Sequence, residues 1–123
     1  MNGGFFMKNI LKSKSYDFSL CIIKLYTYLC KEKGEYVLSK QVLRSGTAIG
    51  ALIAEGEFAQ SKADFISKLS ISLKEANETA YWLSLLKDSG YLSESMYKSI
   101  KPNIEELLKL LVSSIKTAKK NVK

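Results

Sequence analysis

The stretch from Gln41 to Glu57, QVLRSGTAIGALIAEGE, combines three glycines with the only arginine of the chain, Arg44. A glycine-rich run beside a cation can cradle a phosphate, because backbone N–H groups and the cation together surround the anion. The phosphate-loop pattern requires G-x-x-x-x-G-K-[ST] after a strand, whereas Gly50 and Gly56 are six residues apart and no lysine follows them. The dinucleotide pattern G-x-G-x-x-G is absent too, so the stretch predicts no phosphate cradle.

The same small residues fit a contact between two helices. Gly46, Gly50 and Ala54 recur every four residues, so they line one strip of a helix. Small side chains let a neighbouring helix approach closely, which offsets the ~1 kcal/mol that an interior glycine costs relative to alanine. Arg44 and Glu55 lie on the opposite side, about three turns apart and too distant to pair directly. For each of these two charges the alternatives are a partner elsewhere, including on another subunit, and a solvated helix flank.

Residues that commonly perform catalysis or bind metals are scarce. The chain contains no histidine, which removes the commonest general base and metal ligand. Cys21 and Cys30 are nine residues apart on one predicted helix, about 13 Å along its axis, so they cannot form a disulfide with each other. We expect both to pack as small hydrophobic side chains. We therefore expect no catalytic residue, no metal site and no cofactor, and an enzyme built on Glu55, Glu75 and Glu78 is the weakest hypothesis.

The formal charge of +7 is concentrated at the two ends of the chain. Residues 1–14 carry three lysines and residues 109–123 carry five, with no acid in either segment. Such clusters attract the phosphates of nucleic acids, and a solubilising tail is the alternative interpretation. The residues predicted to bind nucleic acid are Lys8, Lys12, Lys14, Lys116, Lys119 and Lys120. Because no uncharged run exceeds ten residues and residues 1–14 lack a signal-peptide pattern, we expect a cytoplasmic protein without a membrane segment.

Apolar residues at helical spacing predict four helices, over residues 15–33, 37–57, 61–89 and from 93 onward. Ser61 and Ser93 are predicted N-caps, and Pro102 predicts a kink or an irregular start before Asn103. Short connections favour antiparallel neighbours, hence an all-α, antiparallel up-down-up-down four-helix bundle with both termini at one pole. The predicted organisation is a flexible basic segment at 1–14, the bundle at 15–118 and a basic tail at 119–123.

Two of the predicted helices carry more apolar side chains than a single stripe needs. In the first helix, Tyr16, Leu20 and Ile23 widen the predicted core-facing stripe. The third helix is apolar on two sides, which either a wide core or self-association would explain. The residues predicted to form the contact between subunits are Ile71, Trp82, Leu85 and Leu86.

Four short motifs occur in a specific order: the arginine, then I-x-x-x-I-x-E-G, then S-K-x-x-F, then G-Y-L after the third predicted helix. Together they resemble the bacterial four-helix-bundle proteins linked to 23S rRNA intervening sequences, the S23-like family, to which the accessory protein of diversity-generating retroelements is related. The resemblance spans roughly residues 15–118. The matching positions are Arg44, Ile49, Ile53, Glu55, Gly56, Ser61, Lys62, Phe65, Gly90, Tyr91 and Leu92.

The resemblance implies an antiparallel four-helix bundle assembled as a ring, typically a pentamer. It also implies a basic surface suspected of contacting RNA or DNA, and no known catalysis. The chain departs from the family pattern where Ala48 and Leu52 replace a serine and an asparagine, and where Ala80 and Ser84 replace glutamates of some relatives. If those polar positions form a shared site, much of it is missing here, and Arg44 and Glu55 are the family's charged pair that remains.

Two functional hypotheses follow from these observations. The favoured one is a non-enzymatic homo-oligomer that binds nucleic acid, above all structured RNA, through a lysine-rich terminal pole. The alternative is a protein-interaction scaffold or an accessory subunit for a nucleic-acid enzyme such as a reverse transcriptase. A neighbouring reverse transcriptase gene would favour the alternative, and a gene inside an rRNA operon would favour RNA binding.

Overall fold

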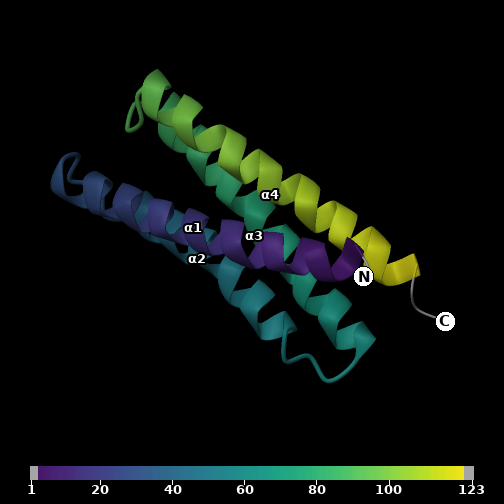
Figure 1. Cartoon of the computed structure of the whole chain (residues 1–123). Coiled ribbons are helices and arrows are strands. Elements are labelled where there is room, and N and C mark those ends of the chain that lie inside the picture. The colour runs from purple at the N-terminus through teal and green to yellow at the C-terminus, as the bar shows by residue number, and fades with distance from the viewer. Residues whose placement is uncertain (1–2, 121–123) are drawn as a thin grey trace.

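The computed structural model describes the backbone of residues 3–120 and the side chains of residues 9–120. It contains four helices, α1 (Gly3–Lys31), α2 (Leu38–Gly56), α3 (Lys62–Asp88) and α4 (Glu94–Lys120), and no strand in that part of the chain (Figure 1). Successive helices run in opposite directions, each packs on its neighbours in the chain, and α1 also packs on α4. The predicted all-α four-helix bundle is therefore confirmed.

The core is built from one apolar stripe of each helix. Helices α2 and α4 have their buried residues on one side, which is the pattern of a helix that covers a core with one face. The buried residues of α3 recur every three or four residues, so they too form one stripe, which packs against α2 and α4. The largest fully buried apolar side chains are Leu11, Ile22, Leu29, Val42, Ile49, Leu69, Leu83, Leu86, Leu107 and Leu111.

Local polar residues start two of the helices as the sequence predicts. The Ser61 hydroxyl accepts a hydrogen bond from the Asp64 backbone N–H (3.0 Å), which caps α3. The Ser93 hydroxyl accepts one from the Met96 N–H (3.1 Å), which caps α4. Each cap satisfies a backbone donor that has no partner inside the first turn of its helix.

Helix α2 is capped in a way that the sequence analysis missed. The carboxylate of Glu35 accepts hydrogen bonds from the backbone N–H groups of Val37 (3.1 Å), Leu38 (3.0 Å) and Ser39 (2.7 Å). Burial alone would raise the pKa of Glu35, but these three donors stabilise the anion and lower its pKa below the ordinary glutamate value. The carboxylate also lies at the positive end of the helix dipole, so it holds the α1–α2 connection against the bundle.

The predicted start of the first helix at residue 15 is wrong, because α1 begins at Gly3 and therefore includes most of the segment that was expected to precede the bundle. The cause is Leu11, whose side chain is buried in the core and extends the apolar stripe of α1 by two turns. The expected irregular start before Asn103 is wrong too, because α4 is helical from Glu94. Pro102 lies on the solvent side of α4, while the buried Ile100 and Ile104 anchor the helix on either side of it.

The glycine strip of α2 packs against α1. A Cβ atom added to Gly46 would lie 2.8 Å and 2.9 Å from the two γ carbons of Ile22, closer than such atoms can approach. A Cβ added to Gly50 would lie 3.2 Å from the backbone oxygen of Ser15. The interpretation of these two glycines as a close helix contact is therefore confirmed. Ala54, the third residue of the strip, is exposed.

The outer face of α1 differs from the prediction. Tyr16, Leu20 and Ile23 were expected to widen the core-facing stripe, but they are 65%, 47% and 46% exposed. The core already receives Phe18, Ile22 and other residues of α1, and the close approach of α2 leaves no room for a wider stripe. These three side chains instead form an exposed apolar stripe beside a groove of about 600 Å³ between α1 and α2.

Candidate nucleic-acid interface

The start of α1 and the end of α4 lie at the same end of the bundle, together with the connection between α2 and α3 (Figure 1). We call this end the terminal pole. The predicted nucleic-acid lysines of α1 and α4 therefore converge there, apart from Lys8, which lies outside the described side chains. Convergence alone does not make the pole basic, because the α2–α3 connection brings acidic residues to the same place.

The two described lysines of α1 are engaged in ion pairs. Lys12 Nζ lies 2.6 Å from a carboxylate oxygen of Glu57, at the end of α2. Lys14 Nζ lies 3.2 Å from a carboxylate oxygen of Glu106, on α4. Exposed pairs of this kind contribute about 0–1 kcal/mol to stability, but each one neutralises a charge that would otherwise attract phosphate. Both acids are remote in sequence from the lysines that they neutralise, so no local pattern could have predicted the pairs.

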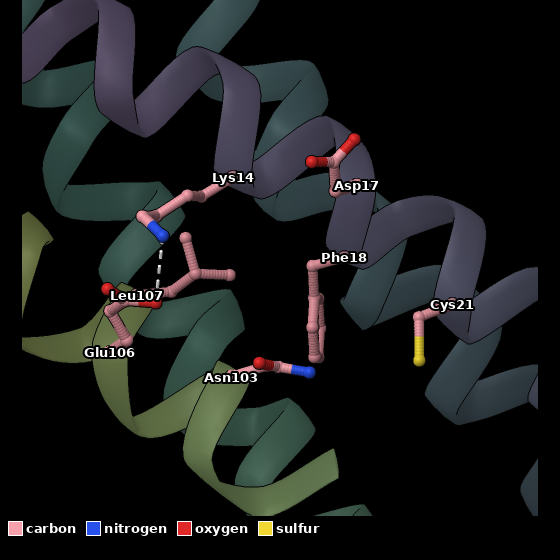
Figure 2. Close-up of a pocket in the computed structure, with 7 residues that line it drawn as sticks. All are labelled: Lys14, Asp17, Phe18, Cys21, Asn103, Glu106 and Leu107. Atoms are coloured by element: carbon pink, nitrogen blue, oxygen red, sulfur yellow. Dashed lines mark ion pairs between the residues drawn. The ribbon is translucent and has the colours of Figure 1, made fainter. Parts of the chain in front are cut away.

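A small polar pocket separates α1 from α4 beside the Lys14–Glu106 pair (Figure 2). Its volume of about 160 Å³ corresponds to roughly five water molecules, which is below the range of ordinary ligand pockets. Figure 2 shows the ion pair at one end of the pocket and the Cys21 thiol at the other. Burial raises the pKa of Cys21, although Lys24 opposes the shift, so the thiol is protonated and a poor nucleophile. The pocket therefore fits solvent better than a nucleotide.

The lysines of α4 near the terminal pole are placed differently. Lys116, Lys119 and Lys120 are exposed, and none of them forms an ion pair with a carboxylate in the described part of the chain. Lys119 and Lys120 lie in the last turn of the helix, where the dipole favours cations. Of the five predicted lysines whose side chains the structure describes, these three are the ones without an ion pair and open to a phosphate.

Arg44 and Glu55 do not pair with each other, as predicted, and each has a partner in its own chain. Arg44 bridges α2 and α3 by binding Glu75 (3.1 Å) and Glu78. The Trp82 indole N–H donates to Glu78 (2.9 Å), and this hydrogen bond together with the guanidinium lowers the pKa of that carboxyl. Glu55 lies 3.7 Å from Lys68 of α3. The arginine and all three carboxylates of the enzyme hypothesis, Glu55, Glu75 and Glu78, are thus held in ion pairs between helices.

Of the four departures from the family pattern, Ser84 has a polar partner in this chain. Its hydroxyl lies 3.2 Å from the Tyr97 hydroxyl, which joins α3 to α4. Ala48, Leu52 and Ala80 are partly buried. Ser84 therefore joins two helices here, and Ala80 packs against the core.

The predicted contact between subunits on α3 is wrong for Leu86. Its side chain is 0% exposed and belongs to the core of its own bundle. Trp82 and Leu85 are partly buried, and Ile71 is 41% exposed. Leu86 lies three residues after the buried Leu83 and seven after the buried Thr79, so it continues the core-facing stripe of α3. The contiguous exposed apolar surface lies on α1 instead, at Tyr16, Leu20 and Ile23.

Buried hydroxyl groups join α2 to α3 and were missed by the sequence analysis. The Thr79 hydroxyl donates to Ser45 Oγ (2.9 Å), and the Ser72 hydroxyl donates to the backbone oxygen of Ile49 (2.9 Å). A serine or threonine every seven residues on α3, at 72 and 79, is a weak signal because such residues are usual on a solvent face. Within residues 9–120 no group of His, Cys, Asp and Glu could hold a metal ion. Over the described helices, none is long and apolar enough to cross a membrane.

Comparisons with known proteins give one family. A family model described as 23S rRNA-intervening sequence protein matches residues 7–113. The fold is similar to the crystal structure, at 1.70 Å resolution, of a protein with unknown function from the S23 ribosomal protein family of Bacteroides thetaiotaomicron VPI-5482. That structure has 54% sequence identity and a TM-score of 0.88, with 89% of this chain and 98% of the other covered. A search of curated proteins found no match.

Proposed function

Because the chain belongs to the 23S rRNA-intervening sequence protein family, we propose that it is a non-enzymatic helical bundle that binds nucleic acid, with structured RNA as its favoured ligand. The family consists of small helical proteins of unknown function and is not a known enzyme family. The observation that carries the proposal is a set of exposed lysines at the terminal end of α4 that have no carboxylate partner among the described residues, namely Lys116, Lys119 and Lys120.

The expected binding is led by phosphate contacts. Lysine presents a compact point charge, and it lacks the planar fork with which arginine reads a base or clamps a phosphate. The only arginine of the chain is bound to two glutamates, so it does not compete for this role. We therefore expect weak sequence specificity and a steep loss of affinity with salt, because each neutralised phosphate releases counterions.

A filter-binding titration with a structured RNA tests the proposal. In the double variant Lys119→Gln/Lys120→Gln, we expect the affinity at 100 mM salt to fall about tenfold or more, because two phosphate contacts are lost. The matched control is Lys33→Gln/Lys40→Gln, which makes the same change in net charge at the opposite end of the bundle and should change the affinity less than about twofold. If the intact protein retains no RNA at 50 mM salt, the proposal is wrong.

The proposal includes a homo-oligomer, a pentamer by resemblance to the family. Its support in this chain is the exposed stripe of Tyr16, Leu20 and Ile23, since contiguous apolar surface on a bundle commonly marks an interface. Light scattering should return a multiple of the 13.8 kDa chain mass, and Leu20→Glu/Ile23→Glu should return the single-chain mass with unchanged helical content. A mass near 13.8 kDa for the unaltered protein would contradict self-association.

The α1–α2 groove also favours the second hypothesis, a scaffold that binds another protein. Its residues are mostly apolar or small, including Ile23, Ala51 and Ala54, and the same stripe of α1 borders it. Self-association and the binding of another protein are two alternative uses of this face, and experiments can distinguish them. A protein that is monomeric by light scattering and retains no RNA at low salt would favour the scaffold over the nucleic-acid-binding function.

A further inference from the structure

Helix α4 carries more than its terminal lysines on the side that faces away from the bundle. At 100° per residue, six lysines fall within an arc of about 100°, and their spacing continues along the whole helix. The buried residues of α4, including Ile104, Leu107 and Leu111, occupy the opposite side. All six lysines are exposed. We call this set the α4 lysine ridge, and it comprises Lys98, Lys101, Lys109, Lys116, Lys119 and Lys120.

The ridge is less neutralised than the rest of the surface. Between Lys98 and Lys120 the only carboxylate in the arc is that of Glu105, which lies 3.9 Å from Lys101. Within the described residues the other five lysines form no ion pair. Glu94 lies in the same arc one turn before Lys98 and pairs with Lys87 (3.5 Å), and Glu106 lies outside the arc and pairs with Lys14 (3.2 Å). The ridge is therefore a nearly uniform line of positive charge.

The dimensions of the ridge match a regular phosphate array. Its 23 residues from Lys98 to Lys120 span about 33 Å, because 22 steps of 1.5 Å separate the first residue from the last. The same length holds roughly ten base pairs of B-form duplex at 3.4 Å per step. Helix α4 is continuous over this length and forms one edge of the bundle (Figure 1). A duplex holds its phosphates in a rigid and regularly spaced array, which a flexible single strand lacks, and a rigid line of charge is complementary to such an array.

The side chains in the arc also argue against a single strand. Proteins that bind single strands stack the bases on exposed aromatic rings. The apolar residues of the arc are Pro102 and Val112, and neither carries an aromatic ring. The nearest aromatic residue, Tyr97, is partly buried, and Lys87 lies over its ring at 4.8 Å. The ridge thus offers charge without a stacking surface.

We propose that the α4 lysine ridge binds the phosphate backbone of an RNA or DNA duplex along its full length. The inference rests on the proposed function and narrows it to one face of the bundle and one form of nucleic acid. The shared chemistry is the duplex phosphate backbone, and separate RNA and DNA duplexes in the test distinguish the two sources.

The test measures fluorescence anisotropy with a 20-base-pair RNA duplex, a 20-base-pair DNA duplex and an unstructured 20-nucleotide strand. The variant Lys98→Gln/Lys101→Gln/Lys109→Gln removes the half of the ridge that is remote from the terminal pole. We expect its duplex affinity at 100 mM salt to fall at least tenfold, and the slope of log affinity against log salt to flatten by about 2, because two of the three lysines have no ion pair with a described residue. The matched control is Lys31→Gln/Lys33→Gln/Lys40→Gln, with the same change in net charge, which should alter affinity less than about twofold.

The outcomes separate the two proposals. If the ridge variant keeps its duplex affinity while Lys119→Gln/Lys120→Gln loses it, binding is confined to the terminal pole and the ridge inference is overturned. If the single strand binds as tightly as the duplexes, the duplex assignment is overturned. If the unaltered protein binds none of the three probes at 50 mM salt, the proposed function fails and the inference fails with it. Circular dichroism of each variant establishes that the bundle is intact.

Discussion

The contact between Gly46 and Ile22 gives a stability prediction whose sign distinguishes close packing from helix propensity. Replacing glycine by alanine inside a helix normally stabilises it by about 1 kcal/mol. In Gly46→Ala, however, the new Cβ would lie 2.8, 2.9 and 3.3 Å from three carbons of Ile22, against about 3.5–4.0 Å for a comfortable contact. Ile22 is 0% exposed and branched at Cβ, so it cannot rotate away.

Overpacking of this kind costs about 1–3 kcal/mol. After the gain in helix propensity, we expect Gly46→Ala to lower the free energy of unfolding by about 1 kcal/mol, or the melting temperature by roughly 3–5 °C. The assay is urea denaturation followed by circular dichroism at one fixed protein concentration, because self-association would make stability depend on concentration. Gly56→Ala is the control, since its Cβ would meet Phe65 at an ordinary 3.4 Å and should leave stability unchanged or slightly raised. Equal stabilisation by both substitutions would refute the close-packing argument.

Three further predictions concern polar contacts, each measured by denaturation. Glu35→Gln should cost about 0.5–2 kcal/mol at pH 7 through the weakened cap of α2. Because folding lowers the pKa of Glu35, its contribution is present above the ordinary glutamate value of 4.5 and is lost as the pH falls through the folded value. The difference between wild type and variant should therefore narrow at pH 3, and a constant difference would contradict the assignment. Thr79→Val should cost about 1–3 kcal/mol by leaving the buried Ser45 hydroxyl without its partner, whereas the double variant with Ser45→Ala should recover most of the loss. Arg44→Lys should lower the free energy of unfolding by about 0.5–1 kcal/mol at low salt and by less at 1 M salt, because one ammonium group replaces a guanidinium that binds two carboxylates. An equal loss at both salt concentrations would show that packing, and not charge, is responsible.

Features that depend on neighbours within one helix turn were predictable from the sequence. The Ser61 and Ser93 caps follow from a hydroxyl beside the first turn, and the contacts of Gly46 and Gly50 follow from a spacing of four. The Glu35 cap is also local, but its carboxylate reaches two to four residues ahead from outside the helix, and a search for serine or threonine at the cap position does not find it.

Features set by packing between distant segments were not predictable. Whether a lysine is free depends on acids such as Glu57 and Glu106, which only the fold brings beside Lys12 and Lys14. Likewise, two apolar sides on one helix do not reveal which neighbours cover them, so Leu86 was assigned to a subunit contact although it lies in the core. The early start of α1 was missed because the segment around Leu11 is rich in lysine and was interpreted as a basic tail. A single apolar residue, Leu11, did not show in the sequence that this segment packs against the core.

The salt dependence of duplex binding by the unaltered protein tests the central claim most directly. Five lysines of the α4 lysine ridge have no ion pair with another described residue, and each phosphate that they neutralise contributes about −0.9 to the slope of log affinity against log salt. We predict a slope of about −4 for a 20-base-pair RNA duplex between 50 and 200 mM salt. A slope near zero, or no binding at 50 mM salt, would contradict the account.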